Sequence, residues 1–112
     1  MSKFAPLPAP PYYAVIFSNQ LSDADPDGYN RMAEKIAQLA TTMPGYIGRE
    51  SSRDADGFAI TVSYWADETA VRNWKQQAEH AAAQEIGKQR WYDHYALRVA
   101  KVERHYEGPE GR

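Results

Sequence analysis

The sequence predicts an α+β fold in which two helices cover one face of a four-stranded antiparallel sheet. Three observations lead to this prediction. Runs of β-branched and aromatic residues alternate with two segments whose apolar residues recur at helical spacing. Asp56-Gly57 is suited to a tight hairpin turn. The length of 112 residues allows one hydrophobic core and is too short for two ordinary domains.

The first half of the chain supplies an arm, a strand and a helix. Residues 1–11 include four prolines, which favour an extended arm, loosely ordered or lying over a partner subunit. Residues 12–19, YYAVIFSN, are apolar on both alternating faces and predict a central strand. Asp25 and Pro26 predict a helix start, and the apolar spacing continues until Pro44-Gly45.

The second half supplies a hairpin, a helix and a strand. Residues 46–54 and 58–65 predict the arms of the hairpin. Asp67 can cap a helix over 68–74, and strong helix formers continue it to residue 92, with a kink near residues 75–77 left open. Residues 94–106 predict the last strand and 107–112 a polar tail. One domain over residues 12–106 therefore has the ferredoxin-like order β-α-β-β-α-β.

Composition excludes several classes of protein. Thirteen Lys and Arg against fifteen Asp and Glu give a net charge of −2 with both signs scattered, so we expect no nucleic-acid partner. The absence of cysteine removes disulfides, thiolate metal sites and cysteine nucleophiles. No G-x-S-x-G elbow or glycine-rich phosphate loop is present. Without a signal-like or membrane-spanning segment, we expect a cytoplasmic protein with no membrane partner.

The sheet face without helices also needs a cover. The first and last strands carry apolar residues at both parities, including Leu97 and Val99 on one side of the last strand and Ala100 and Val102 on the other. We therefore expect a second copy of the chain to cover this face and form a homodimer. A stable interface of this kind would bury roughly 800 Å² per partner.

Three stretches resemble a known family: PGYIGRES, GFAITVSYW and NWKQQAEHAAAQEIGKQRWYDHYALRVAKVER. They are similar to the antibiotic biosynthesis monooxygenase family of dimeric α/β barrels, and the similarity covers residues 12–106. It implies a homodimer with two sheets packed into a barrel and a pocket between sheet and helices in each subunit. Members include cofactor-independent monooxygenases that oxidise polycyclic phenols to quinones, and haem-degrading enzymes; other relatives have no established chemistry.

The haem-degrading members use an Asn near the end of the first strand, a Trp on the helix after the third strand, and a His ten residues beyond that Trp. Asn19 and Trp74 match this pattern, but position 84 is Gln84 and the nearest imidazole is His80, about one helical turn earlier. We therefore expect no cofactor, with haem binding as an alternative. The three histidines fall on different elements without metal-site spacing, so we expect no metal.

Large aromatic residues are the remaining signal. Such side chains suit a flat phenolic ligand through stacking and one hydrogen bond, although in a small domain each more often packs in the core. The candidate substrate-binding residues are Trp65, Trp91, Tyr92, Tyr95 and Arg98. Arg98 and Arg49 either form ion pairs at the sheet edge, the interpretation we favour, or bind an anionic substrate oxygen.

Together these features predict a cofactor-independent monooxygenase acting on a small aromatic, phenolic metabolite. His80 is the candidate base because imidazole titrates near working pH, and Asn19, Trp65 and Trp74 would orient the ring. The predicted catalytic set is therefore His80, Asn19 and Trp74. One alternative is a non-catalytic small-molecule-binding or stress-associated module of the same fold. The other is a haem-binding and haem-degrading monooxygenase.

Overall fold

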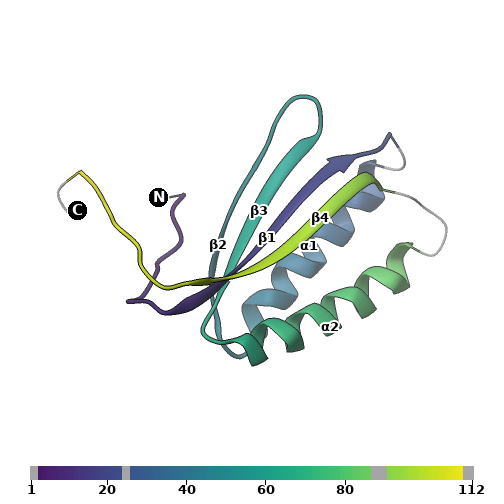
Figure 1. The fold of residues 1–112 in the computed structure, drawn as a ribbon. Helices are drawn as coiled ribbons and strands as arrows, with labels where there is room; N and C mark the ends of the chain where they lie inside the picture. The colour runs from purple at the N-terminus through teal and green to yellow at the C-terminus, as the bar shows by residue number, and fades with distance from the viewer. Residues whose placement is uncertain (1–2, 24–25, 87–90, 110–112) are drawn as a thin grey trace.

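The computed structural model describes residues 3–23, 26–86 and 91–109. Its elements follow the predicted order and are, along the chain, β1 (Tyr12–Leu21), α1 (Pro26–Thr42), β2 (Tyr46–Arg53), β3 (Phe58–Trp65), α2 (Glu68–Ile86) and β4 (Tyr92–Val102). Both helices lie on the same side of the sheet (Figure 1). The ferredoxin-like fold is thus confirmed. Neither helix is long and apolar enough, within the described residues, to cross a membrane.

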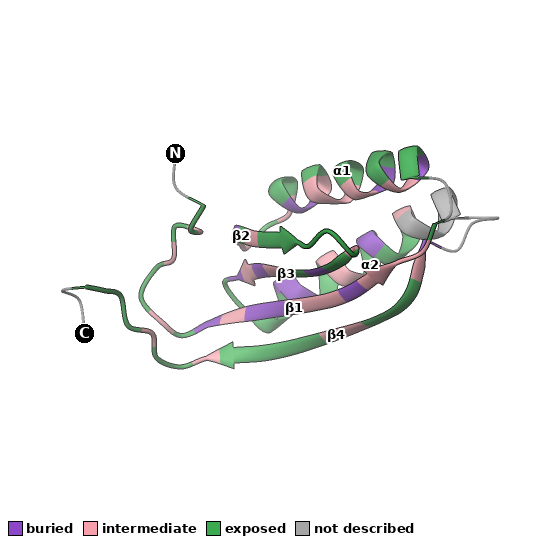
Figure 2. Cartoon of the chain, turned by 90° about the horizontal axis from the view of Figure 1, so that it is seen from above, coloured by how far each residue is buried: buried purple, intermediate pink, exposed green. Residues whose placement is uncertain are grey.

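The four strands form one sheet in the order β2-β3-β1-β4, and every neighbouring pair is antiparallel. The central position of β1 explains its apolar residues on both faces. Val15 points to the helices and is almost completely buried, whereas Ala14 points to the other face and is also buried. Figure 2 shows that burial concentrates in β1 and β3, whereas β2 and β4 at the two edges are largely exposed.

The hairpin and the first helix end where the sequence predicted. Gly57 has a φ of 89°, and the Asp54 side chain accepts hydrogen bonds from the backbone N–H groups of Asp56 and Phe58 at 2.9 and 3.0 Å. Gly45, with a φ of 85°, follows α1, and its carbonyl accepts a hydrogen bond from the Ala66 N–H at 2.8 Å. These two glycines supply the left-handed backbone conformations that the turns need.

The boundary between α2 and β4 corrects one prediction. The sequence predicted a helix to residue 92, but α2 is one helix over Glu68–Ile86 and Tyr92 already belongs to β4. Tyr92 pairs with Leu21 of β1, and the Trp91 carbonyl accepts a hydrogen bond from the Ser22 N–H at 2.7 Å. Pairing with β1 outweighs local helix propensity here. The strand ends at Val102 instead of residue 106, and residues 87–90 of the predicted helix lie outside the described residues.

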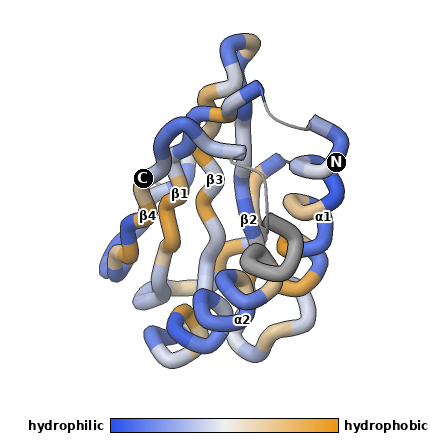
Figure 3. Tube along the Cα trace, turned by 90° about the vertical axis from the view of Figure 1, so that its right-hand side faces the viewer, coloured by the Kyte–Doolittle hydropathy of each residue, from blue (hydrophilic) through white to orange (hydrophobic). Residues whose placement is uncertain are grey.

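The core lies between the sheet and the helices. Trp65 is fully buried, donates its indole N–H to the Ser63 hydroxyl at 2.9 Å, and packs with Val15 and Val71. Figure 3 shows hydrophobic stretches in β1, β3 and β4 and a largely hydrophilic α2. This distribution is expected for a surface helix that buries only one side.

The N-terminal arm lies against its own sheet on the helix-free face. The Ala5 N–H donates to Glu50 Oε2 at 3.0 Å, and Pro6 is so close to Gly48 that an added Cβ there would lie 3.0 Å from it. The Tyr64 hydroxyl donates to the other oxygen of Glu50 at 2.6 Å. The arm was predicted to be loosely ordered or to lie over a partner, whereas the structure places this part of it on β2.

Candidate functional site

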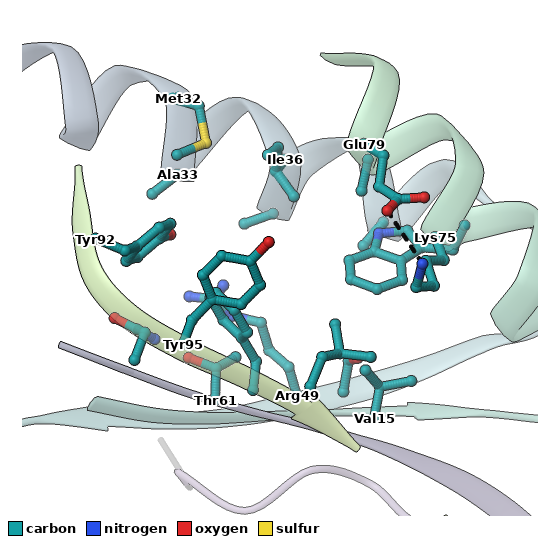
Figure 4. Close-up of a pocket in the computed structure, with 18 of the residues that line it drawn as sticks. Val15, Met32, Ala33, Ile36, Arg49, Thr61, Lys75, Glu79, Tyr92 and Tyr95 are labelled. Carbon is teal, nitrogen blue, oxygen red and sulfur yellow. Dashed lines mark hydrogen bonds and ion pairs between the residues drawn. The ribbon is translucent and has the colours of Figure 1, made fainter. Parts of the chain in front are cut away.

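A cavity of about 380 Å³ lies between the helix-facing side of the sheet and the two helices. Alternate residues of a strand point to the same face, so Val15, Phe17 and Asn19 of β1 form its floor together. Figure 4 shows side chains from both helices and the neighbouring strands turned toward this space. The wall is mostly apolar or aromatic and includes Met32, Ile36, Ala40, Tyr46, Trp74, Ala78, Tyr92, Tyr95 and Leu97. This volume and lining are typical of a site for a small organic ligand.

Asn19 is one of two buried polar residues that line the cavity, the other being Ser63, and only 2% of its surface is exposed. Its Oδ1 accepts a hydrogen bond from Nη2 of Arg53 at 3.0 Å, and the same nitrogen donates to the Tyr29 hydroxyl at 2.8 Å. The Arg53 guanidinium also lies over the Tyr29 ring, 5.4 Å from its centroid. Because Arg53 donates a hydrogen bond to the Asn19 carbonyl oxygen, the orientation of this amide is fixed.

Four aromatic rings meet at the end of the cavity formed by β1, α1 and β4. Tyr92 stands edge-on to Phe17 and to Tyr29, with centroids 5.5 and 5.7 Å apart, and Tyr95 lies 5.7 Å from Tyr92. Burial, and next the nearby Tyr29 hydroxyl, raise the pKa of Tyr92, whereas Arg53 acts in the opposite direction. Tyr92 therefore stays protonated at neutral pH and can act only as a neutral hydrogen-bonding group.

Trp74 brings an unpaired donor to the wall of the cavity. Its ring packs on Trp65, with centroids 5.5 Å apart, and Trp65 itself belongs to the core. The Trp74 indole nitrogen is buried and has no hydrogen-bond partner among the described residues. Leaving such a donor unpaired costs about 1–3 kcal/mol. Because the nitrogen itself has almost no accessible surface, a ligand acceptor would satisfy this donor only after a shift of the ring.

The predicted site residues fall into three groups, two of them at or next to the cavity. Asn19, Trp74, Tyr92 and Tyr95 line the cavity. Trp65 and Trp91 are buried but are not among the lining residues, and Trp65 supports the Trp74 ring from the core.

His80 and Arg98 lie away from the cavity. His80 is exposed on α2 and does not line the cavity, although its neighbour Glu79 does. Arg98 donates to the Ser18 hydroxyl at 3.3 Å on the helix-free side of the sheet. The positions of His80 and Arg98 therefore lend no support to roles in this cavity. The side chain of Gln84 lies outside the described residues.

Sequence reasoning missed several residues of this site. Tyr29, Lys75 and Glu79 line the cavity, and Arg53 holds Asn19. Arg49, which the sequence suggested either for an ion pair at the sheet edge or for binding a substrate oxygen, lines the cavity as well. Arg49 and Arg53 are four positions apart on β2, so the strand period places both on the helix-facing side once the register is known. That period was available from the sequence. The identity of the face became clear only from the pairing of Arg49 with Ser63.

The described residues offer no evident metal or haem site. They contain no group of three His, Cys, Asp or Glu side chains that could hold a metal ion. No histidine belongs to the described lining, and the His105 ring bonds instead to the Tyr12 hydroxyl at 2.7 Å. The residues present therefore do not fit a haem bound through a proximal histidine.

The fold and its mostly apolar cavity define a small α+β domain of the ligand-binding or enzymatic type. The family model "antibiotic biosynthesis monooxygenase" matches residues 13–86, so the chain belongs to this family. The uncharacterized protein YqjZ from Bacillus subtilis is 53% identical over 97 residues, covering 87% of this chain and 84% of YqjZ.

A second relative has an activity in its name. The jasmonate monooxygenase ABM of Pyricularia oryzae is 30% identical over 92 residues; the match covers 80% of this chain and 43% of that longer protein. Among solved structures, a variant of SnoaB from Streptomyces nogalater, described as a cofactor-independent oxygenase, superposes with a TM-score of 0.68. That match covers 84% of this chain and 95% of SnoaB at 11% identity, and so it shows a shared fold.

Proposed function

We propose that this protein is a cofactor-independent monooxygenase that oxidises a small phenolic aromatic to a quinone-type product. The observation that carries the proposal is the mostly apolar cavity, lined by Trp74, Tyr92 and Tyr95, in a chain of the antibiotic biosynthesis monooxygenase family. Its resemblance to SnoaB, described as cofactor-independent, supports a reaction without a bound cofactor.

The proposed reaction requires little from the protein besides positioning and the exclusion of water. An anthrone-type substrate loses a proton to give a phenolate-like anion, which transfers an electron to O₂. The ring carbon finally exchanges two hydrogens for one oxygen atom of O₂, and the second oxygen atom leaves as water with those hydrogens. Electrons from the substrate thus reduce O₂ completely. The apolar wall of the cavity, away from the exposed Arg49, limits contact of the radical and peroxide intermediates with water.

The residues lining the cavity supply three roles in this proposal. The aromatic group of Phe17, Tyr92 and Tyr95 holds the ring by stacking and edge contacts. Asn19 and the unpaired indole N–H of Trp74 are the polar groups that fix the substrate oxygens. Glu79, which lines the cavity, is the acceptor we propose for the proton in place of the exposed His80.

We also propose that the active form is a homodimer. On the helix-free face, Phe58 and Ile60 of β3 are 43% and 44% exposed in the single chain. Neighbouring apolar residues on such a face mark an interaction surface. A second copy packed on it would bury these side chains and close the sheet pair into a barrel.

Oxygen uptake tests the proposed reaction. The purified protein is mixed anaerobically with anthrone-type and other hydroxyaromatic compounds. Oxygen is then admitted, and its consumption is measured. We expect wild type to exceed buffer clearly, and Trp74→Phe, which keeps a ring but removes the N–H donor, to lose roughly tenfold in kcat/KM. Glu79→Gln should lower the rate more than His80→Ala if the proton acceptor is assigned correctly.

Two further results would point to other functions. Tight binding of an aromatic compound with no oxygen consumption would indicate a non-catalytic binding module. A Soret band on adding haemin, shifted in His80→Ala, would indicate haem binding. If wild type consumes no more oxygen than buffer across the whole panel, the oxygenase proposal is wrong.

A further inference from the structure

The charges around the cavity do not cancel. Among the described residues, its charged lining consists of Arg49, Lys75 and Glu79. Lys75 Nζ lies 3.1 Å from Glu79 Oε2, one helical turn away on α2, so these two charges offset each other. Arg49 has no ion pair or hydrogen bond with another described residue. Figure 4 shows Arg49 on the sheet side of the cavity and the Lys75–Glu79 pair on the helix side.

Arg49 gives the sheet side of the cavity a positive charge, and a second guanidinium, that of Arg53, adds to it. Arg53 lies on the same face of β2 as Arg49, and the intervening Ser51 bonds its hydroxyl to that of Thr61 at 2.6 Å. Among the described residues, Arg53 bonds only neutral groups: the Gly57 carbonyl, Asn19 and Tyr29. Two cations with no carboxylate partner in the described part of the chain therefore stand along the β2 side of the cavity. An anion there is attracted by both.

Arg49 is also at a place where binding an anion costs little. It lines the cavity but remains exposed, so a charge beside it keeps part of its hydration. A charge pushed into the apolar wall near Met32 and Ile36 would lose that hydration. A ligand with one charged end and an apolar body therefore matches the cavity better than a neutral ligand or one charged throughout.

Resting on the proposed function, we infer that the substrate is an aromatic carboxylate and that Arg49 binds its carboxyl group. The planar guanidinium can donate two parallel hydrogen bonds to a carboxylate, a geometry that a phenol oxygen or a carboxamide does not match. The ring then lies among the aromatic residues. The unpaired indole N–H of Trp74 meets an oxygen on the body of the ligand.

A matched pair of probes tests this inference without turnover. The acid 6-hydroxy-2-naphthoate and its carboxamide share ring, phenol and size but differ in charge. Their affinities are measured by calorimetry under argon. We expect wild type to bind the acid roughly tenfold more tightly than the amide, as one charge-assisted bidentate contact would provide. In Arg49→Gln this preference should disappear while the affinity for the amide stays within about twofold.

Two further variants separate charge from geometry. Arg49→Lys keeps the charge but cannot donate two parallel hydrogen bonds to a carboxylate. It should retain only part of the preference for the acid. Arg72→Gln, an exposed arginine on α2 that does not line the cavity, should retain all of it.

Three results would overturn the inference: equal affinities for the two probes in wild type, an equal loss of both in Arg49→Gln, or no binding of either probe. The comparison of acid and amide in wild type needs no variant, so a misfolded mutant cannot hide the answer. The proposed oxygenase function can fail separately. A tenfold preference for the acid over the amide without any oxygen uptake would support the carboxylate site and contradict the oxygenase reaction. Turnover of neutral phenols without this preference would support the reaction and contradict the carboxylate site.

Discussion

Asn19 shows how one polar side chain on an apolar floor depends on a residue from another strand. Its side chain is almost completely buried, and its carbonyl oxygen is satisfied by Arg53 from the edge strand β2. Arg53 in turn is steadied by the Tyr29 hydroxyl and ring. The amide can present a constant face to a ligand only while this contact holds. Arg53 is therefore a positioning residue that acts through Asn19.

Replacing Arg53 tests this dependence. Arg53→Met keeps the apolar stem but leaves the buried Asn19 oxygen without its donor, which should cost about 1–3 kcal/mol in the free energy of unfolding. Urea denaturation measures this change, and Arg72→Gln on the exposed side of α2 is the control. Ligand affinity should fall together with stability, whereas Arg53→Lys should recover part of both. A loss in Arg53→Met no larger than that of the control would show that Asn19 does not need Arg53.

At the scale of elements, the turn between α1 and β2 determines how closely α2 can approach the sheet. Gly45 has a φ of 85°, and a Cβ built on it would lie 2.6 Å from Cβ of Ala70 in the first turn of α2. Ala70 belongs to the core with Val15 and Trp65. The glycine is thus required twice, by the backbone conformation and by the close packing of α2.

Gly45→Ala should therefore destabilise the protein by about 2–4 kcal/mol, combining left-handed strain with an overlap in the core. Gly57→Ala is the matched control, because its φ of 89° imposes the same strain. An added Cβ there would meet the flexible end of Gln20 at 3.2 Å and Cβ of Leu21 at 3.4 Å, so no atom overlaps as closely as Ala70 does at Gly45. Thermal or urea unfolding should show a smaller loss of about 1–2 kcal/mol for this control.

The double variant Gly45→Ala/Ala70→Gly isolates the overlap. Removing the Ala70 methyl group leaves room for the new Cβ. The double variant should therefore lose less free energy of unfolding than the two single variants lose together. Additive losses would mean that the two positions do not contact each other in solution.

These elements also show what a sequence can and cannot predict. Asp25-Pro26, Pro44-Gly45 and Asp56-Gly57 are local signals, and the structure has its turns and helix ends near each of them. The start of β4 was missed because Tyr92 is held in a strand by its pairing with Leu21, which local propensity does not contain. Some cavity residues could likewise be predicted from the sequence, and others required the strand pairing. Residues matched by family resemblance, Asn19 and Trp74, do line it, whereas Arg49 could be placed only from the register of β2.

At the scale of the whole molecule, the two faces of the sheet have different roles. The helix-facing side holds the core and the cavity, and the other side is partly covered by the N-terminal arm near Gly48 and Glu50. Phe58 and Ile60 on β3 remain exposed on that second side. Ile60 pairs with Ser18, which points away from the cavity because its neighbours Phe17 and Asn19 point into it. A partner on this face would leave the cavity openings of both subunits free.

Ile60→Lys should therefore separate the proposed dimer without unfolding the subunit. Ile60 is 44% exposed in the single chain, so a lysine there stays hydrated in the monomer but would be buried without a partner charge at the dimer interface. Val99→Lys is the control, because Val99 is similarly exposed, at 47%, but pairs with Val15 and so lies on the helix-facing side. Light scattering coupled to size exclusion should give a dimer for wild type and Val99→Lys, and a monomer for Ile60→Lys with an unchanged circular dichroism spectrum. A wild type that is monomeric at every concentration, or an Ile60→Lys variant that stays dimeric, would show that this face is not the interface.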